Sequence, residues 1–435
     1  MKTICVVGLG YIGLPTASLF ATNRYQVYGV DTNPIVVETI NKGKIHIEEA
    51  GLRTLVEAAV VSGKLKAGTH PVQADAFIIA VPTPFDRDRR PDFTHVFGAV
   101  LAVAPLLREG NLVILESTVS PRTTLRAAEM IGKERPDLVG ELGDPVNSLK
   151  VLVAHCPERV LPGRILKELV ENDRVVGGVT KRASEEAAAL YAGIVSGRIY
   201  QTDATTAEMV KLSENTFRDV NISLANELAV VCEELEIDVW EVIKLANKHP
   251  RVQILSPGPG VGGHCIAVDP WFIVSEFPEQ TAVMRSARER NDAMPRVVFE
   301  RVQSLIAGQS HPKIACLGAS YKGNVGDSRN SPAVKIFEVL CTAFGSKGTA
   351  AIADPHLANT DLPLQPLGEV LKGASLILLL TDHDEFRALD PFAVASTVRV
   401  KKVLDTRNFL DHARWQNAGF DVHVLGKGKN SKQKS

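Results

Sequence analysis

Several features are scarce or absent in the sequence, and each absence excludes a class of protein. The 435 residues carry a formal net charge of only −1, so nucleic acid and anionic membranes are not expected as partners. No apolar run approaches the length of a membrane span, and no signal-peptide pattern precedes the first strand pattern at residues 3–7. The six cysteines lie far apart without a C-x-x-C pair, which favours free thiols in a reducing compartment. We therefore expect a cytoplasmic protein.

The composition is ordinary for a globular chain, with 45% hydrophobic and 23% charged residues. The chain is too long for one hydrophobic core, so two or three domains are expected. Strand and helix patterns alternate at both ends, and long helical patterns occupy the middle. This order predicts an α/β fold with two Rossmann-like doubly wound domains joined by a long-helix central domain. The expected segments are 1–205, 206–310 and 311–425, followed by a disordered basic tail at 426–435.

The N-terminal strand pattern at residues 3–7 runs directly into a glycine motif. Gly8, Gly10 and Gly13 follow it in G-x-G-x-x-G spacing, a helical pattern comes next, and Asp31 ends the second strand pattern. In this context the first glycine permits a tight turn, the second lets a pyrophosphate approach the backbone, and the third lets helix pack on strand. Asp31 would accept hydrogen bonds from ribose hydroxyls and would repel a 2′-phosphate. The motif therefore predicts a dinucleotide site that prefers NAD to NADP.

Later strand patterns in the first segment end at polar or proline-bearing residues. One reaches Pro82 and Thr83, another reaches Thr118, and a third leads into Glu158 and Arg159. The carboxyl ends of parallel strands open onto the cofactor crevice of such a fold. These residues are therefore site candidates, although Thr83 and Thr118 could equally be turn and N-cap residues.

The central segment begins with a helical pattern at about 205–236, which a capping box at 205–208 is predicted to open. Lys211, Asn215 and Asp219 recur at every fourth position and form one polar stripe. Such a stripe is usually solvated. It could instead present an amine and an amide to a substrate.

A glycine-rich loop at 258–270, GPGVGGHCIAVDP, carries Cys265 and Asp269. Its glycines and prolines form neither helix nor strand, and glycine lets backbone amides approach a ligand closely. A thiol at the end of such a loop is well placed for nucleophilic attack. The alternative is a surface turn with a buried apolar cysteine. The second α/β segment, 311–425, does not repeat the G-x-G-x-x-G motif, so it need not bind a second dinucleotide.

These motifs together resemble one family over nearly the whole chain. VVGLGYIGLP, AVPTP, EST, CPERVLPG, KLSENTFRDVNI and GPGVGGHCIAVDPWF are similar to the signatures of the nucleotide-sugar 6-dehydrogenases, which include UDP-glucose and GDP-mannose dehydrogenases. The CPERVLPG and glycine-loop forms most resemble the branch that acts on UDP-N-acetyl-D-mannosamine, with UDP-N-acetylglucosamine 6-dehydrogenases as close relatives. The resemblance implies NAD-dependent, four-electron oxidation of a C6 alcohol to a carboxylate, feeding polysaccharide biosynthesis. It also implies that 311–425 binds the UDP sugar and that a homodimer forms through the central helices.

The resemblance also implies roles for individual residues. Cys265 would form a thiohemiacetal and then a thioester, while Lys211 and Asn215 would stabilise the oxyanion. Asp269 and Thr118 would position water, and Glu158 matches a family acid. The cofactor candidates are Gly8, Gly10, Tyr11, Ile12, Gly13, Asp31, Pro82, Thr83, Thr118 and Arg329. The substrate candidates are Glu158, Arg159, Val160, Lys211, Asn215, Arg218, His249, Arg251, Gly262, His264, Tyr321 and Lys322.

The chain departs from the family pattern at two places. Pro162 stands where the glucose branch has a second acid, which could leave room for an acetamido group that Arg159 contacts. Asn330 replaces an acid in the segment 321–330.

Two other functions compete with this one. Zinc binding by the pairs His155-Cys156 and His264-Cys265 is disfavoured, because adjacent residues of an extended chain point to opposite sides; no metal is expected. A non-catalytic NAD-binding regulatory protein would have no need of the Cys265 thiol. Release of NADH on adding substrate would distinguish the dehydrogenase from these alternatives.

Overall fold

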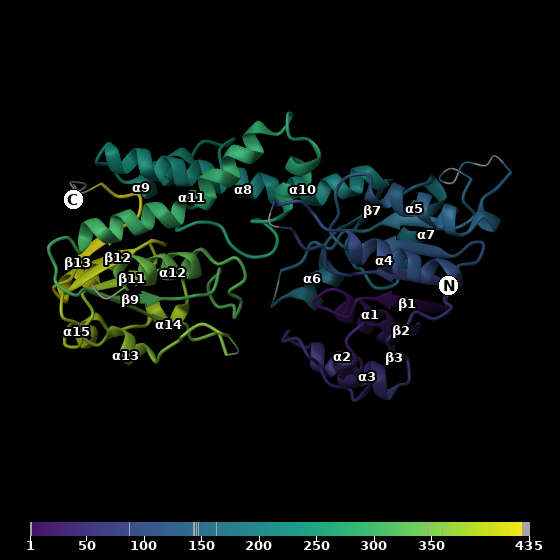
Figure 1. Ribbon diagram of the computed structural model, residues 1–435, viewed down its shortest axis with the longest axis horizontal. Coiled ribbons are helices and arrows are strands. Elements are labelled where there is room, and N and C mark those ends of the chain that lie inside the picture. The colour runs from purple at the N-terminus through teal and green to yellow at the C-terminus, as the bar shows by residue number, and fades with distance from the viewer. Residues whose placement is uncertain are drawn as a thin grey trace. The chain divides into compact units, whose positions relative to one another are not determined.

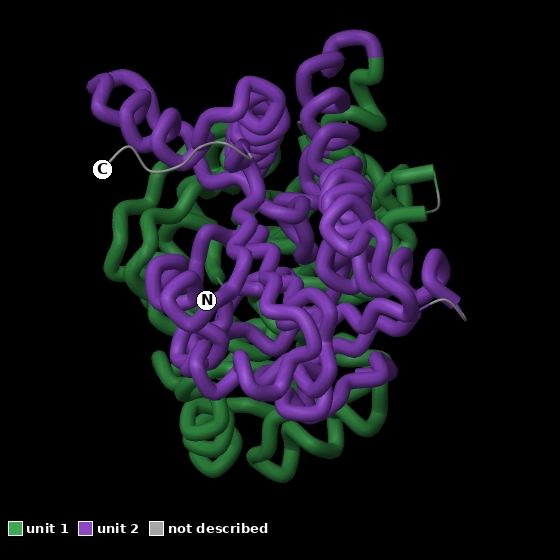
Figure 2. The backbone as a smooth tube through the Cα atoms, turned by 90° about the vertical axis from the view of Figure 1, so that its left-hand side faces the viewer, with its two compact units in different colours: residues 1–214, 271–278 green, residues 215–270, 279–435 purple. Residues whose placement is uncertain are grey.

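The computed structural model describes residues 2–86, 88–141, 144, 146, 148–161, 163–345, 348–358 and 360–428. These form two compact units. Unit 1 consists of residues 1–214 and 271–278, and unit 2 of residues 215–270 and 279–435 (Figure 2). No helix in the described part of the chain is both long and apolar enough to cross a membrane.

Unit 1 is built on an eight-stranded sheet of order β3-β2-β1-β4-β5-β6-β7-β8 (Figure 1). All neighbouring strands are parallel except β6 and β7. The strands are β1 (Thr3–Val7), β2 (Gln26–Val30), β3 (Leu65–Gly68), β4 (Ala76–Ile79), β5 (Leu112–Leu115), β6 (Leu152–His155), β7 (Arg174–Gly178) and β8 (Ile199–Asp203). The order, with β1 between β2 and β4, puts the topological switch point at the end of β1. The predicted Rossmann-like first domain is thereby confirmed.

The helices of unit 1 include two short 3-10 turns. They are α1 (Gly13–Thr22), α2 (Pro34–Asn41), α3 (Leu52–Val61), α4 (Thr94–Val103), η1 (Ala104–Leu106), α5 (Thr123–Glu134), η2 (Pro136–Leu138), α6 (Ile165–Glu171) and α7 (Lys181–Tyr191). The central strands are continuous apolar runs because both faces of the sheet are covered; β4 and β5 are buried throughout. Side chains such as Phe20 and Tyr191 complete one core cluster.

Two helices pass from one unit to the other. They are α8 (Ala204–Glu234) and α10 (Asp269–Glu276). The predicted capping box at 205–208 is wrong, because Asp203 supplies the cap. Its carboxylate accepts hydrogen bonds from the backbone N–H and the hydroxyl of Thr206. An acid directly before the first turn satisfies the orphan N–H groups there, so Glu208 is available for another task.

Unit 2 holds a five-stranded parallel sheet of order β10-β9-β11-β12-β13. Its strands are β9 (Lys313–Leu317), β10 (Thr349–Ala353), β11 (Leu376–Leu379), β12 (Lys402–Asp405) and β13 (Asp421–Val424). Its other helices are α9 (Val239–Ala246), α11 (Ala282–Leu305), α12 (Pro332–Phe344), α13 (Leu367–Leu371), α14 (Asp384–Arg387), α15 (Pro391–Ala395) and α16 (His412–Asn417). The predicted second α/β domain and the long central helices are confirmed.

The chain after β13 returns to the helical part of unit 2. The Gly428 N–H donates to the carbonyl of Ile237, and the Val239 N–H donates to the carbonyl of Gly426. Residues 426–428 of the predicted basic tail therefore have defined positions beside the start of α9. Residues 429–435 lie outside the described part.

Candidate active site

The glycines of the turn after β1 differ in their surroundings: two are crowded by protein atoms and one faces open space. A Cβ built on Gly8 would lie 2.6 Å from the Ala80 carbonyl oxygen, and one built on Gly13 would lie 1.8 Å from the Gly8 carbonyl oxygen. A Cβ on Gly10 would meet nothing within 4 Å. The protein itself requires the first and third glycines. The space in front of Gly10 suits the close approach of a pyrophosphate.

The surroundings of this turn fit the rest of a dinucleotide. One oxygen of Asp31 accepts the Leu9 N–H at 3.2 Å and the other accepts the Asn33 N–H at 2.9 Å, which fixes a half-buried carboxylate at the end of β2. Ile12 precedes α1 and makes no side-chain cap, and the positive end of the α1 dipole at this turn favours an anion. Tyr11 beside it is 42% exposed.

The segment after β4 carries the next two cofactor candidates. Pro82 is exposed and Thr83 is half-buried. The Val81 carbonyl accepts the hydroxyl of Ser117 at 2.7 Å, so the loops after β4 and β5 are tied together next to Thr118.

Unit 1 brings three of the predicted catalytic residues into contact. The Lys211 ammonium donates to the Thr118 hydroxyl at 2.6 Å and forms an ion pair with Glu158. Lys211 is only 4% exposed, so the predicted polar stripe is not solvated here. A buried ammonium needs such partners. Burial, helped by the charge of Lys211, lowers the pKa of nearby His155 to about 3, so this imidazole stays neutral.

Glu208, one turn before Lys211 on α8, has a role that sequence reasoning missed. Its two carboxylate oxygens accept the N–H groups of Arg122 and Thr124, and the Thr124 hydroxyl as well. Glu208 therefore caps the N-terminus of α5, a distant helix, and anchors the segment that follows Thr118. Burial raises the pKa of Glu208 to about 7.

Arg159 is held by unit 1 itself. Its guanidinium donates to Glu214 of α8 at 2.7 Å and to the carbonyl of Asp173, and Val160 next to it is half-buried. These contacts hold the loop that carries Glu158. Pro162, the departure noted in the sequence, lies outside the described residues.

Unit 2 contains Cys265 and a second polar group. Asn215 donates to Asp269 and accepts a hydrogen bond from Arg218. Asp269 is 2% exposed and begins α10. Its N–H donates to the carbonyl of Cys265 at 2.7 Å. Cys265 and Asp269 are thus fixed to each other, and Asp269 is fixed to the α8 stripe through Asn215.

Cys265 differs from the other cysteines in its exposure. It is half-buried, Cys341 is exposed, and the remaining four are buried. Burial raises the pKa of Cys5 and of Cys156 to about 11, so these thiols are inert near neutral pH. A half-buried thiol on a glycine loop is the better nucleophile candidate.

The glycine loop packs on the segment after β9. A Cβ on Gly262 or Gly263 would lie 2.8 or 2.9 Å from side-chain atoms of Tyr321, so only glycine fits against this ring. The Gly263 N–H donates to the Arg329 carbonyl, and the Asn330 amide donates to the Gly263 carbonyl. The amide that replaces a family acid at Asn330 therefore has a partner that a carboxylate could not serve.

His264 and Arg329 meet at the edge of this loop. Arg329 donates to Asp327 at 2.6 Å and lies 3.1 Å from Nδ1 of His264. Burial alone would raise the pKa of Asp327, but hydrogen bonds from Arg329 lower it. The remaining substrate candidates lie on the surface: His249, Arg251 and Lys322 are exposed.

One group of possible metal ligands occurs among the described residues, and it was not anticipated. It consists of His356, His383 and Glu385. The Asn324 N–H points at Nδ1 of His383, and Nε2 of the same ring faces Asp354 at 3.0 Å. Both nitrogens of that buried ring are engaged, so this arrangement is structural. The pairs His155-Cys156 and His264-Cys265 are not in the group.

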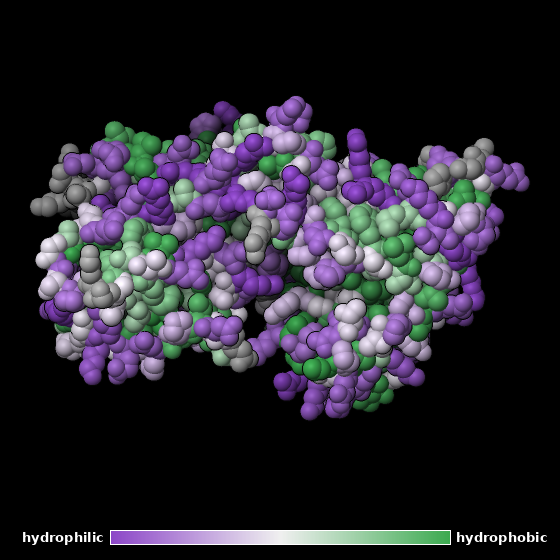
Figure 3. All heavy atoms as spheres, in the orientation of Figure 1, coloured by the Kyte–Doolittle hydropathy of each residue, from purple (hydrophilic) through white to green (hydrophobic). Residues whose placement is uncertain are grey.

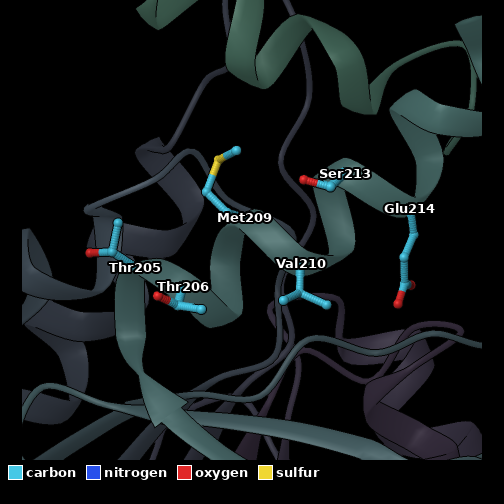
Figure 4. Close-up of a pocket in the computed structure, with 6 residues that line it drawn as sticks. All are labelled: Thr205, Thr206, Met209, Val210, Ser213 and Glu214. Atoms are coloured by element: carbon cyan, nitrogen blue, oxygen red, sulfur yellow. The ribbon is translucent and has the colours of Figure 1, made fainter.

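One hollow of unit 1 lies along the start of α8. It measures ≈ 450 Å³ and is lined by the first turns of α8 (Figure 4). Its lining residues are Thr205, Thr206, Met209, Val210, Ser213 and Glu214. No predicted site residue lines it.

Comparison with known proteins identifies the family. Three models match: the NAD binding domain of the UDP-glucose/GDP-mannose dehydrogenase family at residues 2–195, its central domain at 205–293 and its UDP binding domain at 315–412. The chain therefore belongs to the UDP-glucose/GDP-mannose dehydrogenase family and contains its NAD-binding domain. The glycine turn and Asp31 fit that cofactor.

Three relatives illustrate the similarity. A UDP-N-acetyl-D-mannosamine dehydrogenase of Methanococcus maripaludis is 48% identical over 98% of each chain. An NDP-N-acetyl-D-galactosaminuronic acid dehydrogenase of Ralstonia nicotianae is 49% identical over 93% of this chain and 96% of its own. Among solved structures, a UDP-D-ManNAc dehydrogenase of Pyrococcus horikoshii is 40% identical, with a TM-score of 0.88, over 98% of this chain and 99% of its own.

Proposed function

We propose that the chain oxidises the C6 alcohol of UDP-N-acetyl-D-mannosamine to the carboxylate, with NAD as oxidant and a thioester on Cys265 as intermediate. The observation that carries the proposal is the fixed placement of half-buried Cys265, whose backbone carbonyl accepts the Asp269 N–H while the Asp269 carboxylate accepts the Asn215 amide. A pure binding protein would need none of these three groups.

The chemistry explains why a thiol is needed. When bound, NAD accepts the hydride in each of the two oxidations. An aldehyde has no second hydride to give until a nucleophile adds to its carbonyl. The Cys265 thiolate adds there and forms a thiohemiacetal. Loss of hydride leaves a thioester, and water then releases the acid and restores the thiol.

The polar residues have separate tasks in this scheme. Lys211 and Asn215 lie one turn apart on α8 and would donate to the oxyanion. Glu158 pairs with the Lys211 ammonium and keeps it oriented, while Thr118 stands ready beside it to hold the substrate hydroxyl or water. Asp269, buried and bonded to Asn215, would accept a proton from water during thioester hydrolysis.

The sugar is the part of the proposal with the closest rivals. The family match to a UDP binding domain supports a UDP sugar, and several relatives are named for UDP-N-acetyl-D-mannosamine. The Ralstonia relative is named for an N-acetylgalactosaminuronic acid. An acetamido group is common to these names. The glucosamine epimer stays the alternative, and contact of Arg159 with the acetamido group stays a prediction.

We further propose that the chain forms a homodimer through α8. Phe217, Leu224 and Val231 recur every seven residues and are 65%, 48% and 47% exposed, which is the spacing of a helix–helix seam. Hydrophobic residues also gather at the surface around α9, at the upper left of Figure 3. A second copy carries the same stripe on its own α8, so one two-fold interface would bury the stripes of both copies.

Sedimentation velocity tests the dimer. Leu224→Asp should convert the protein to a monomer, whereas Ile35→Asp, on an equally apolar and 71% exposed site of α2, should not. A Leu224→Asp protein with unchanged mass would contradict a dimer interface on α8.

The buried, unpaired thiols further support a reducing, cytoplasmic setting.

The activity is tested by counting NADH. Purified protein is given NAD with UDP-N-acetylmannosamine, its glucosamine and galactosamine counterparts, or UDP-glucose. We expect two NADH for each mannosamine sugar consumed and little from the others. Cys265→Ser should form no acid. Preference for another acetamido sugar would preserve the mechanism and change the substrate. No NADH from any sugar, with NAD still bound, would overturn the proposal.

A further inference from the structure

A chain of buried polar side chains connects the α8 stripe to the loop that carries Cys265. Asp219, one turn after Asn215, accepts hydrogen bonds from Arg288 and from the Asn291 amide, both on α11. Asn226 of α8 donates to the Asn291 side-chain oxygen at 2.9 Å. The N–H of Gly258, where the glycine loop begins, donates to the Asn226 side-chain oxygen at 2.8 Å.

All four of these side chains are buried, so their polarity is not explained by contact with water. Asp219 and Asn226 are 0% exposed, and Arg288 and Asn291 are 1% exposed. Burial raises the pKa of Asp219, although the charge of Arg288 and the hydrogen bond from Asn291 oppose this shift. Apolar residues of similar volume would often give equal or greater stability at such positions. Directional hydrogen bonds that end on one particular backbone N–H provide something that apolar packing cannot, which is a defined position for that backbone.

The glycine loop also rests directly on α11. Pro295 inside α11 has no N–H, so the carbonyl of Asn291, four residues earlier, receives no helical hydrogen bond. A Cβ built on Gly260, whose φ is +132°, would lie 3.2 Å from that carbonyl oxygen. Asn291 therefore supports the loop at two places, indirectly at Gly258 through the Asn226 amide and directly at Gly260 through its own backbone carbonyl.

Between Gly260 and Cys265 the loop has little freedom. Gly262 and Gly263 lie against Tyr321, and the N–H groups of Val268 and Asp269 donate to the Cys265 carbonyl. The loop is thus held by contacts along its length from Gly258 to Cys265.

We propose that Asp219, Asn291 and Asn226 form a positioning relay that sets the glycine loop at Gly258 and through it the place of the Cys265 thiol. The proposal rests on the proposed function only for its kinetic consequence. Its structural consequence, the reactivity of the Cys265 thiol, can be measured whether or not the enzyme turns over any sugar.

The test compares two asparagine truncations in a Cys341→Ser background, which removes the exposed thiol. Asn226→Ala deletes the acceptor of the Gly258 N–H. Asn247→Ala is the matched control, because exposed Asn247 also makes two backbone bonds, both to Ile254, yet lies outside the relay. Asn226→Asp keeps an acceptor oxygen for Gly258.

Two readouts should move in opposite directions in Asn226→Ala. Loosening the loop should expose the thiol, so alkylation of Cys265 by iodoacetamide, followed by peptide mass spectrometry, should accelerate about threefold or more. The kcat for NADH formation should fall roughly tenfold, because small misplacements of a nucleophile are costly, while KM for NAD stays unchanged. Asn226→Asp keeps the acceptor for the Gly258 N–H but loses the donor to Asn291, so it should restore both values only in part. Asn247→Ala should leave both unchanged.

Each other outcome would overturn the relay. Equal alkylation rates in wild type and Asn226→Ala would show that Gly258 does not position Cys265, even if no sugar is oxidised. A similar response in Asn247→Ala would assign the effect to general loosening of the segment. If Asn226→Ala does not fold, Asn291→Ala is measured with the same expectations. Loss of the fold in both variants would assign these residues to stability instead.

Discussion

The two sheets of this molecule begin with the same turn. Gly8 follows β1 with φ +93° and donates its N–H to the last residue of β2, and Gly318 follows β9 with φ +97° and donates to the last residue of β10. In each sheet an acid follows the neighbouring strand and accepts N–H groups of the turn: Asp31 in the first, Asp354 in the second.

The difference lies in what surrounds the acid. Asp31 is half-buried and bonded only to nearby N–H groups, so it has capacity for a ribose hydroxyl. The side chain of Asp354 is fully buried and faces His383. Although burial would raise it, hydrogen bonds from His383 and from the Ala319 N–H hold the pKa of Asp354 well below its usual range. The carboxylate of Asp354 is thus enclosed by other groups of the protein.

The two loops after the glycine also diverge. In unit 1 the helix starts at Gly13, directly after the turn, whereas α12 starts only at Pro332. The longer second loop, residues 318–331, packs on the glycine loop that carries Cys265. One framework therefore fits a dinucleotide in the first sheet and supports the loop of Cys265, the proposed nucleophile, in the second. A shared turn geometry does not imply a shared ligand.

The largest effect that separates the two turns is expected from Gly10→Val. A Cβ there meets no protein atom within 4 Å, so the fold should persist while the pyrophosphate is excluded. NAD affinity measured by calorimetry should fall at least about a hundredfold, which corresponds to about 2.8 kcal/mol. Gly98→Ala, at another uncrowded glycine, is the control. Undiminished NAD binding by Gly10→Val would show that NAD does not bind at the first turn.

The converse change is Asp354→Asn, which should affect stability and not the cofactor. It removes the charge that His383 and the turn N–H groups contact, and breaking such a buried pair costs about 3 kcal/mol. The midpoint of thermal unfolding should drop by roughly 5 °C. NAD affinity, measured well below that midpoint, should equal that of wild type. A loss of NAD affinity would show that the two turns are not independent.

Much of this comparison could be predicted from the sequence, where the determinants are local. The turn at Gly8, the place of Asp31 and the second α/β domain follow from strand patterns and glycine spacing. The stripe of Lys211, Asn215 and Asp219 follows from helical period, and its burial excludes the solvated stripe, while its contact with a substrate stays a prediction.

The rest depends on contacts between residues far apart in the chain. The pairing of Asp354 with His383 and the relay from Asp219 to Gly258 have no spacing signal, because helices and strands from different parts of the chain bring them together. Glu208 shows how local reasoning fails: its spacing from Thr205 suggested a capping box, but Asp203 already caps α8 and Glu208 caps α5.

Glu208 and Asp354 provide a smaller contrast in pH dependence. Both are buried carboxylates that accept backbone N–H groups, but only Asp354 has an imidazole partner. An unfolded Glu titrates near 4.5 and folded Glu208 near 7, so the unfolded chain binds fewer protons between these values and stability falls as pH rises through them. Glu208→Gln should remove on the order of 2 kcal/mol of this dependence. The thermal midpoints of Glu208→Gln and wild type are compared from pH 5 to 8, and the difference between them should shrink as pH rises. Curves of midpoint against pH that stay parallel, as expected for exposed Glu227→Gln, would contradict the assignment.

The smallest expected effect is that of Asp31→Asn. The amide oxygen can still accept the Leu9 N–H, so the turn should keep its shape, but the Asn33 N–H loses its acceptor and the thermal midpoint should fall slightly. What changes is the charge facing the ribose. NAD affinity should fall about tenfold, or about 1.4 kcal/mol, and NADP affinity should rise, because the amide no longer repels a 2′-phosphate. The same change at Asp354 should leave the ratio of NAD to NADP affinity untouched. A ratio that shifts in neither variant would mean that Asp31, like Asp354, serves the turn and not the ligand.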